Sequence, residues 1–192
     1  MAQTSTTLIG STSMVSITAR STISFTVSNN RISDSANGFG NLEVNDIITV
    51  SGTTSNNGDK IITAKASDGS YIDVAETIAN ESADGSTLTT ITQTGLVSTK
   101  VAGDGYYSKP DGVHTVAYHI SNTVPATAGI KMQGSLATVP TESDWFDISS
   151  SVATPDLSTT AFSTNFTGNF VWVRAKITGV TAGSITSILY NN

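Results

Sequence analysis

The sequence contains no cysteine, only four prolines and few charged residues, which make up 12% of its 192 positions. The lack of cysteine excludes disulfides, thiolate metal sites and cysteine nucleophiles, so stability must come from packing and sheet hydrogen bonds. No stretch approaches the roughly 18 consecutive apolar residues of a membrane span. The first twenty residues also lack the basic start and continuous apolar segment of a secretory signal. We therefore expect no membrane partner and no signal-directed export.

Residues that favour helices, namely leucine, glutamate, lysine and arginine, are scarce as well. In their place stand 27 serines and 31 threonines, together about 30% of the chain. Hydroxyl residues are poor in helix interiors, whereas threonine is enriched in strands. Because β-branched and aromatic residues are spread evenly along the chain, a disordered chain is excluded too. The composition therefore predicts an all-β protein.

Basic residues are few and scattered: there are nine against fifteen acidic residues, and the net charge is −6. Binding to nucleic acid needs clustered lysine and arginine to neutralise phosphates, so we expect no nucleic-acid partner. Residues 1–94 hold nine acidic and four basic residues, net −5, while residues 95–192 hold six and five, net −1. This asymmetry favours two domains with different surfaces.

Alternation of apolar and hydroxyl residues is the main pattern in the first half of the chain, and turn clusters rich in Asn, Asp and Gly separate the alternating runs. Between these runs, Phe39, Leu42 and Val44 are expected to plug one end of a core. We predict strands at Ser21–Val27, Asp46–Ser51, Lys60–Ala64, Tyr71–Val74 and Thr87–Ile91.

The second half repeats the alternation with more aromatic residues, and here we predict strands at His114–Ser121, Gly129–Ser135, Trp145–Ile148, Phe162–Phe166, Phe170–Ile177 and Ser184–Tyr190. Turn residues are dense at 103–112. The chain is thus expected to form two small antiparallel β-sandwich or barrel-like domains, at residues 1–94 and 113–192, with a connector at residues 95–112.

Catalytic groups do not converge in this pattern. His114 and His119 are five residues apart in one predicted strand, so they point to opposite faces and cannot share a metal or a serine. Asp144 and Asp147 are three positions apart, which also places them on opposite faces of a strand, so they cannot form a shared site. We expect a strand start in which Trp145 packs inward and both carboxylates lie in solvent. We therefore predict no catalytic, cofactor-binding or metal-ligating residues.

Aromatic residues on otherwise polar faces are the better indication of an interface, because contiguous exposed apolar patches usually mark contact surfaces. In the strand Phe170–Ile177 the aliphatic residues form one face, which we expect to face the core. The other face carries Trp172 beside two basic residues, which we expect to meet an acidic partner or the acidic first domain. If they are not core residues, the candidate interface residues are Tyr106, Tyr107, Phe170, Trp172, Arg174, Lys176 and Tyr190.

Several motifs occur in a fixed order in the second half: Gln133-Gly-Ser-Leu136, Trp145-Phe-Asp-Ile148, Gly168-Asn-Phe-Val-Trp-Val-Arg-Ala175 and Thr181-Ala-Gly-Ser-Ile-Thr186. This order resembles β-sandwich modules in virion structural proteins of tailed bacteriophages, including those that infect cyanobacteria. The first half, with Asn45-Asp-Ile-Ile-Thr-Val-Ser-Gly52 and Asn56-Asn-Gly-Asp59, resembles another small β module of phage particles.

The resemblance implies a non-enzymatic virion component that needs no cofactor and forms homo-oligomers, for example trimers. It favours a capsid decoration or cement protein that binds the major capsid protein or other virion proteins. Its location would be the virion, and the host cytoplasm during assembly. A neck, tail or fibre component and a carbohydrate-binding adhesion module remain as alternatives, with a glycan-degrading enzyme as a more remote one.

Overall fold

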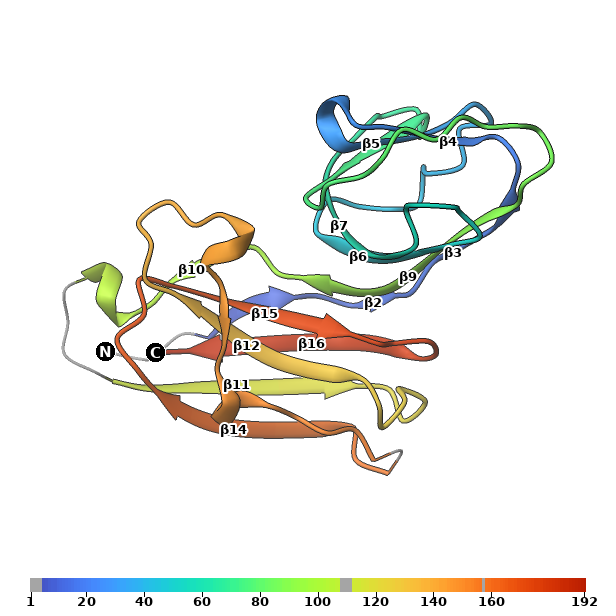
Figure 1. Ribbon diagram of the computed structural model, residues 1–192. Helices are drawn as coiled ribbons and strands as arrows, with labels where there is room; N and C mark the ends of the chain where they lie inside the picture. Colours follow the sequence, from blue (N-terminus) through green and yellow to red (C-terminus); the bar gives the residue numbers. More distant parts are fainter. Residues whose placement is uncertain (1–4, 108–111, 157) are drawn as a thin grey trace. The chain divides into compact units, whose positions relative to one another are not determined.

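The computed structural model describes residues 5–107, 112–156 and 158–192, and it is all-β apart from four short 3-10 helices. The chain divides into two compact units. We call residues 14–96 the curled-sheet unit. The sandwich unit comprises residues up to Ser13 together with Val97–Asn192. The predicted all-β class with sandwich-like and barrel-like domains is confirmed (Figure 1).

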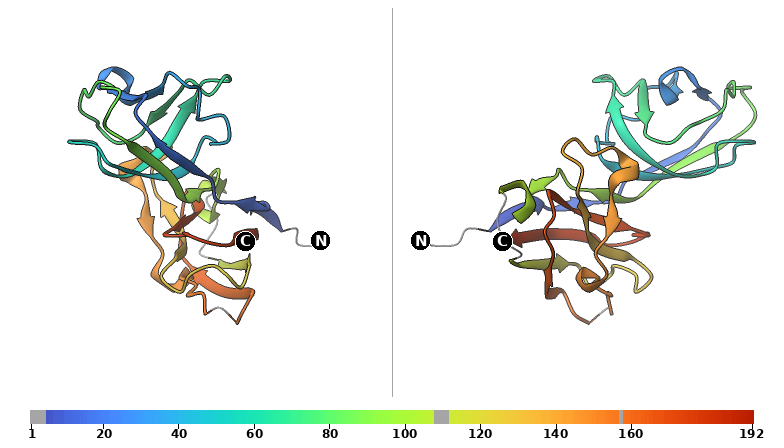
Figure 2. Two further views of the ribbon diagram at one scale, coloured as in Figure 1. Left: turned by 90° about the vertical axis from the view of Figure 1, so that its right-hand side faces the viewer. Right: turned by 60° about the vertical axis from the view of Figure 1, so that its left-hand side comes forward.

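The curled-sheet unit is one antiparallel sheet that bends around its own core (Figure 2). Its strand order is β3, β9, β6, β7, β8, β5 and β4. The strands are β3 (Ser16–Arg20), β4 (Ile23–Thr26), β5 (Arg31–Asp34), β6 (Asp46–Ser51), β7 (Gly58–Lys65), β8 (Tyr71–Val74) and β9 (Thr89–Val97). Alternation places Phe25, Ile32 and Ile72 on the core face, each at most 3% exposed. Phe39 and Leu42 fill the core as predicted, whereas Val44 is 43% exposed.

The sandwich unit packs two antiparallel sheets against each other (Figure 1). The first has the order β1, β16, β11 and β14, and β2 also pairs with β16. Its strands are β1 (Thr6–Ile9), β2 (Thr12–Ser13), β11 (Val113–Ile120), β14 (Ala161–Thr167) and β16 (Ser184–Asn191). In the second sheet, β15 pairs with β12 and β10, and β12 pairs with β13. Its strands are β10 (Val101–Ala102), β12 (Gly129–Ser135), β13 (Phe146–Asp147) and β15 (Trp172–Thr178).

The aliphatic face of β15 is buried as predicted, with Val173, Ala175 and Ile177 fully covered. Val116, Tyr118 and Ile188 of the other sheet are fully buried as well, so the core of the sandwich unit lies between the two sheets. Strand β15 begins at Trp172 rather than at the predicted Phe170. The predicted strand at Trp145–Ile148 is limited to Phe146 and Asp147, because residues 142–144 form a 3-10 helix.

The division of the chain differs from the predicted domains at residues 1–94 and 113–192 and the connector at 95–112. Strands β1 and β2 pair with β16, so they belong to the sandwich unit although they lie at the N-terminal end. Strand β9 runs through the start of the predicted connector, and residues 108–111 of the connector lie outside the described residues. In the part of the chain that the structure describes, no helix is long and apolar enough to cross a membrane.

Candidate interaction surface

Aromatic side chains gather at one end of the sandwich unit. The ring of Tyr106 lies 5.1 Å from that of Tyr107 and 4.7 Å from that of Trp172, measured between centroids. The two tyrosines are 51% and 56% exposed, and Trp172 is half-buried. Three of the predicted interface residues therefore do lie on one surface.

The short helix Asp104–Tyr107 holds both tyrosines against the start of β15. The amide of Gly103 donates to the carbonyl of Val171, and the amide of Gly105 donates to the carbonyl of Phe170, at 3.0 and 2.8 Å. A Cβ at Gly103 would lie 2.5 Å from the carbonyl oxygen of Phe170, so a larger residue cannot make this approach. The glycines thus fix the helix where Tyr106 can pack on Trp172.

The loop after β12 carries two exposed aliphatic side chains that neighbour, in the chain, the residues that contact Trp172. Ser135, the last residue of β12, pairs with Trp172, and the indole N–H of Trp172 donates to the carbonyl of Thr138 at 3.0 Å. Leu136 and Val139 flank this contact and are 65% and 80% exposed. The Nζ atom of Lys100 lies 4.3 Å from the centroid of the Trp172 ring. We call Tyr106, Tyr107, Leu136, Val139 and Trp172 together the Tyr106 cluster.

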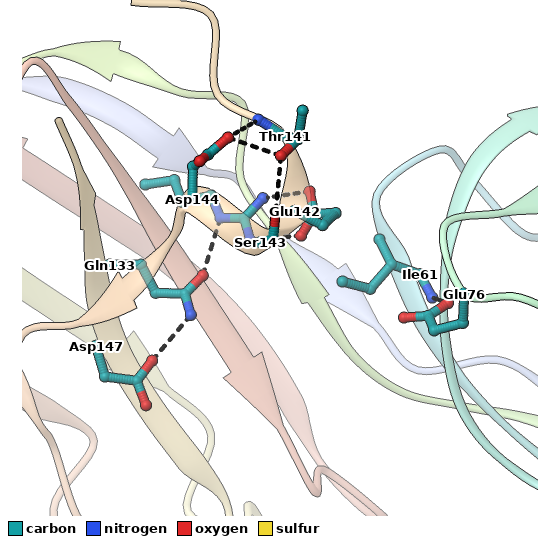
Figure 3. A network of polar contacts seen from close by, with 9 residues as sticks. Ile61, Glu76, Gln133, Thr141, Glu142, Ser143, Asp144 and Asp147 are labelled. Atoms are coloured by element: carbon teal, nitrogen blue, oxygen red, sulfur yellow. Dashed lines mark hydrogen bonds and ion pairs between the residues drawn. The ribbon is translucent and has the colours of Figure 1, made fainter. Parts of the chain in front are cut away.

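A polar network anchors the segment that carries this loop (Figure 3). Arg174 donates two hydrogen bonds to the carboxylate of Glu142, at 2.8 and 2.7 Å, and a third to Gln133 at 2.9 Å. Figure 3 shows Gln133 between Asp147 and the segment of Glu142, and its amide donates to Asp147 at 2.8 Å. Trp145 packs against the guanidinium, 4.2 Å from the ring centroid to Cζ. The network ties the loop to the rigid sheet.

Three of the predicted interface residues are buried rather than exposed. Phe170 is 8% exposed and Tyr190 is 2% exposed, because both rings complete the end of the sandwich core. Arg174 is 5% exposed and pairs with Glu142, so its acidic partner comes from its own unit. Lys176, two residues further along β15, is half-buried. Of the seven predicted residues, Tyr106, Tyr107 and Trp172 contact one another, so we take the Tyr106 cluster as the candidate surface.

A buried polar group lies beneath this end of the unit. His114 is fully buried, with Nδ1 2.6 Å from the hydroxyl of Tyr190 and Nε2 3.0 Å from the carbonyl of Gly168. Since a carbonyl only accepts, Nε2 carries a proton, and in the neutral ring Nδ1 then accepts from the hydroxyl of Tyr190. The carboxylate of Asp104 lies 3.6 Å from Nε2 and accepts from the amide of Gly112. Every ring atom that can hydrogen bond is thus satisfied.

This Asp104, His114 and Tyr190 arrangement has the residue types of a catalytic triad but not the access that one needs. Burial raises the pKa of Tyr190, and the negative charge of Asp104 raises it further. A tyrosine that holds its proton and is 2% exposed does not attack a substrate. His119 lies on the other face of β11, as predicted, and contacts the hydroxyl of Ser187 at 2.9 Å. The arrangement is a structural one.

The two predicted solvent-facing carboxylates have separate structural tasks. Asp144 is exposed and accepts from the amide and hydroxyl of Thr141, which caps the 3-10 helix. Asp147 is bound by Lys131 and Gln133. Among the described residues, no group of three or more His, Asp or Glu side chains is arranged to hold a metal ion.

Leu136 and Val139 were not predicted as interface residues. They lie in Ser-Leu-Ala-Thr-Val-Pro, where apolar residues interrupt a segment with no strand alternation. Large aliphatic side chains in such a loop, close to a proline, are the signal that could have identified them. Comparison with protein-family models, with curated proteins and with solved structures finds no match to this chain.

Proposed function

We propose that this protein is a non-enzymatic structural component of a bacteriophage particle that decorates and stabilises the head. The Tyr106 cluster is the observation that supports it. In this proposal the cluster binds the major capsid protein or another virion protein, and the curled-sheet unit remains available for a second contact.

The cluster suits a protein partner better than a sugar. The ring of Tyr106 is turned by 81° from that of Tyr107 and by 53° from that of Trp172, so the rings form no flat platform for stacking. Leu136 and Val139 add branched aliphatic surface, and none of the five side chains carries a charge. Uncharged aromatic and aliphatic groups are typical of the buried centre of protein interfaces.

A small cluster of this kind binds weakly on its own, which suits a decoration protein. Copies arranged on a symmetric shell, or joined in a homo-oligomer such as a trimer, multiply weak contacts into stable attachment. The firmly anchored loop also limits the entropy lost on binding, because Glu142 and Arg174 already hold it to the sheet.

The location is tested by mass spectrometry of purified particles whose heads and tails have been separated. We expect the protein in the head fraction, in a copy number that follows the shell symmetry. Recovery with tails would support the neck, tail or fibre alternative, and absence from all particles would exclude a virion role.

The surface is tested by adding purified protein to heads that lack it. Replacing Val139 with Asp places a charge in the cluster, and we expect binding to weaken by about tenfold or more. The matched control is Leu88→Asp, because Leu88 is 57% exposed and belongs to the curled-sheet unit. Equal loss in both variants would show that the Tyr106 cluster is not the attachment surface.

A further inference from the structure

The outer face of β4, β5 and β8 in the curled-sheet unit is a polar surface. Ser24, Ser33 and Tyr71 form one cross-strand row, while Phe25, Ile32 and Ile72 point to the core. A second row contains Arg31 and Asp73. Hydroxyl groups and one aromatic ring thus lie side by side on a sheet whose other face is rigidly packed.

This face is hollowed into a depression of about 380 Å³. Its size is at the lower end of the range for small-molecule sites, about 300–1,000 Å³. The depression is open, and its lining includes Ser24, Arg31, Ser33, Asp34, Ser35 and Tyr71.

Several hydroxyls in the depression are not used by the fold. Within the part of the chain that the structure describes, the side chains of Ser24, Ser33 and Ser35 have no hydrogen-bond partner in the protein. Each hydroxyl can donate one hydrogen bond and accept others. The depression therefore offers both donors and acceptors to a ligand.

The charged groups of the depression are already paired. Arg31 donates from Nε and Nη2 to the two carboxylate oxygens of Asp73, at 2.7 and 3.0 Å, and its guanidinium lies 3.4 Å from the centroid of the Tyr71 ring. Asp34 accepts from Thr22 and from two backbone amides, and its carboxylate lies 3.4 Å from Arg20. Neither charge is left for a ligand of opposite sign.

We propose that this depression binds a neutral saccharide. Sugars carry hydroxyls that both donate and accept, which matches the serines, and their C–H groups can pack against the half-buried ring of Tyr71, which lines the depression. Anionic saccharides are disfavoured, because Arg31 is neutralised by Asp73 and the unit carries nine acidic against four basic residues, net −5. The site is independent of the Tyr106 cluster, so each can fail without the other.

Binding is measured by NMR of the ¹⁵N-labelled full chain with maltohexaose, cellohexaose and chitohexaose as neutral probes and with heparin and polygalacturonate oligomers as anionic ones. We expect at least one neutral probe to shift the amides of Ser24, Ser33 and Ser70, with a dissociation constant on the order of 1 mM. No shift with any of the neutral probes, or tighter binding of an anionic probe, would overturn the proposal.

Variants locate the binding. Ser33→Tyr fills the depression and should weaken binding by about tenfold or more, whereas Ser16→Tyr, at an exposed position of β3, should leave it unchanged. If Ser33→Tyr disturbs the fold, the double change of Ser24 and Ser33 to Ala removes hydroxyls without adding bulk and should still reduce affinity. Unchanged affinity in the folded variants would place any sugar binding elsewhere. Head attachment through the Tyr106 cluster is measured separately and is expected to survive these changes.

Discussion

The hydroxyl of Tyr190 donates a 2.6 Å hydrogen bond to Nδ1 of His114, and both side chains are buried. The bond joins β16 to β11 inside the sandwich unit, beside the ring of Phe166. It explains why Tyr190, a candidate interface residue, is part of the core instead.

Replacing Tyr190 with Phe keeps the ring and removes the donor, so Nδ1 of His114 is left buried without a partner. We expect the free energy of unfolding to fall by about 1–3 kcal/mol, measured by urea denaturation. Tyr106→Phe is the control, because Tyr106 is 51% exposed, and its effect should stay within about 0.5 kcal/mol. Equal stability of the wild type and Tyr190→Phe would show that this hydrogen bond does not stabilise the fold.

The ring of Phe170 rests on Gly134 of β12. A Cβ at Gly134 would lie 2.6 Å from a ring carbon of Phe170, closer than packed atoms allow. Without the clash, alanine would be more favourable than glycine in a strand, so a loss of stability on substitution would indicate the clash. We expect Gly134→Ala to cost about 1–3 kcal/mol in urea denaturation. Gly10→Ala meets no atom within 4 Å and should not destabilise; equal effects would argue against the close approach.

Asp46 should make stability depend on pH. Burial raises its pKa to about 6, against an ordinary 3.8, although the amide of Glu43 donates to the carboxylate. As pH rises from about 4 to about 6, the unfolded chain loses this proton first, so stability falls, by up to about 3 kcal/mol. Asp46→Asn removes the charge and keeps an acceptor for Glu43. We expect it to be more stable than the wild type at pH 7.5 by about 1–3 kcal/mol, and no more stable at pH 3.5.

Asp156 should make stability depend on pH in the opposite direction, which the same urea denaturation series can measure. The amides of Thr159 and Ser158 donate to its carboxylate and lower its pKa to about 2. Its contribution is present above the ordinary pKa and is lost as pH falls through the lowered one. Asp156→Asn should therefore be less stable than the wild type at pH 7.5, and the difference should shrink toward pH 2. The same pH trend in both variants would refute the assignment.

Arg174 should matter for folding rather than for assembly. Arg174→Met removes the pairing to Glu142 and the donor to Gln133, and we expect a loss of about 1–3 kcal/mol and faster proteolysis within residues 136–145. Lys176→Met, two residues along the same face, is the control and should change stability by less than about 0.5 kcal/mol. Unchanged stability with impaired assembly would restore Arg174 as an exposed interface residue.

Local alternation was sufficient to predict most strands. Asp46–Ser51, Tyr71–Val74 and Gly129–Ser135 are confirmed with their bounds, because their side chains alternate between a core and a polar face. The strand Arg31–Asp34 was missed, since its second inward residue is Asp34, a carboxylate that is buried only because Thr22 and Arg20 reach it. Because these partners lie in other parts of the chain, the sequence around Asp34 does not indicate that its carboxylate is buried.

The local sequence pattern also could not predict which residues on one face of a strand are buried. Arg174 and Lys176 share a face of β15, yet only Arg174 is buried, because Glu142 lies in a loop more than thirty residues away in the chain. Similarly, alternation predicts the strand that ends near Tyr190 but not that His114 covers its hydroxyl. Tyr106 and Tyr107 were named as candidates because exposed aromatic side chains usually mark interfaces, and both are exposed.

The pairing of Thr6 with Tyr190 has a consequence for how the protein is made. A ribosome synthesises the whole curled-sheet unit before it reaches β16, so strands β3 to β9 can pair with one another while β1 still has no partner strand. Domains fold as units during synthesis, whereas contacts between distant segments wait for the last segment. The sandwich unit can therefore be completed only after β16 has been synthesised, and any surface that depends on its closed form is acquired later than the fold of the curled-sheet unit.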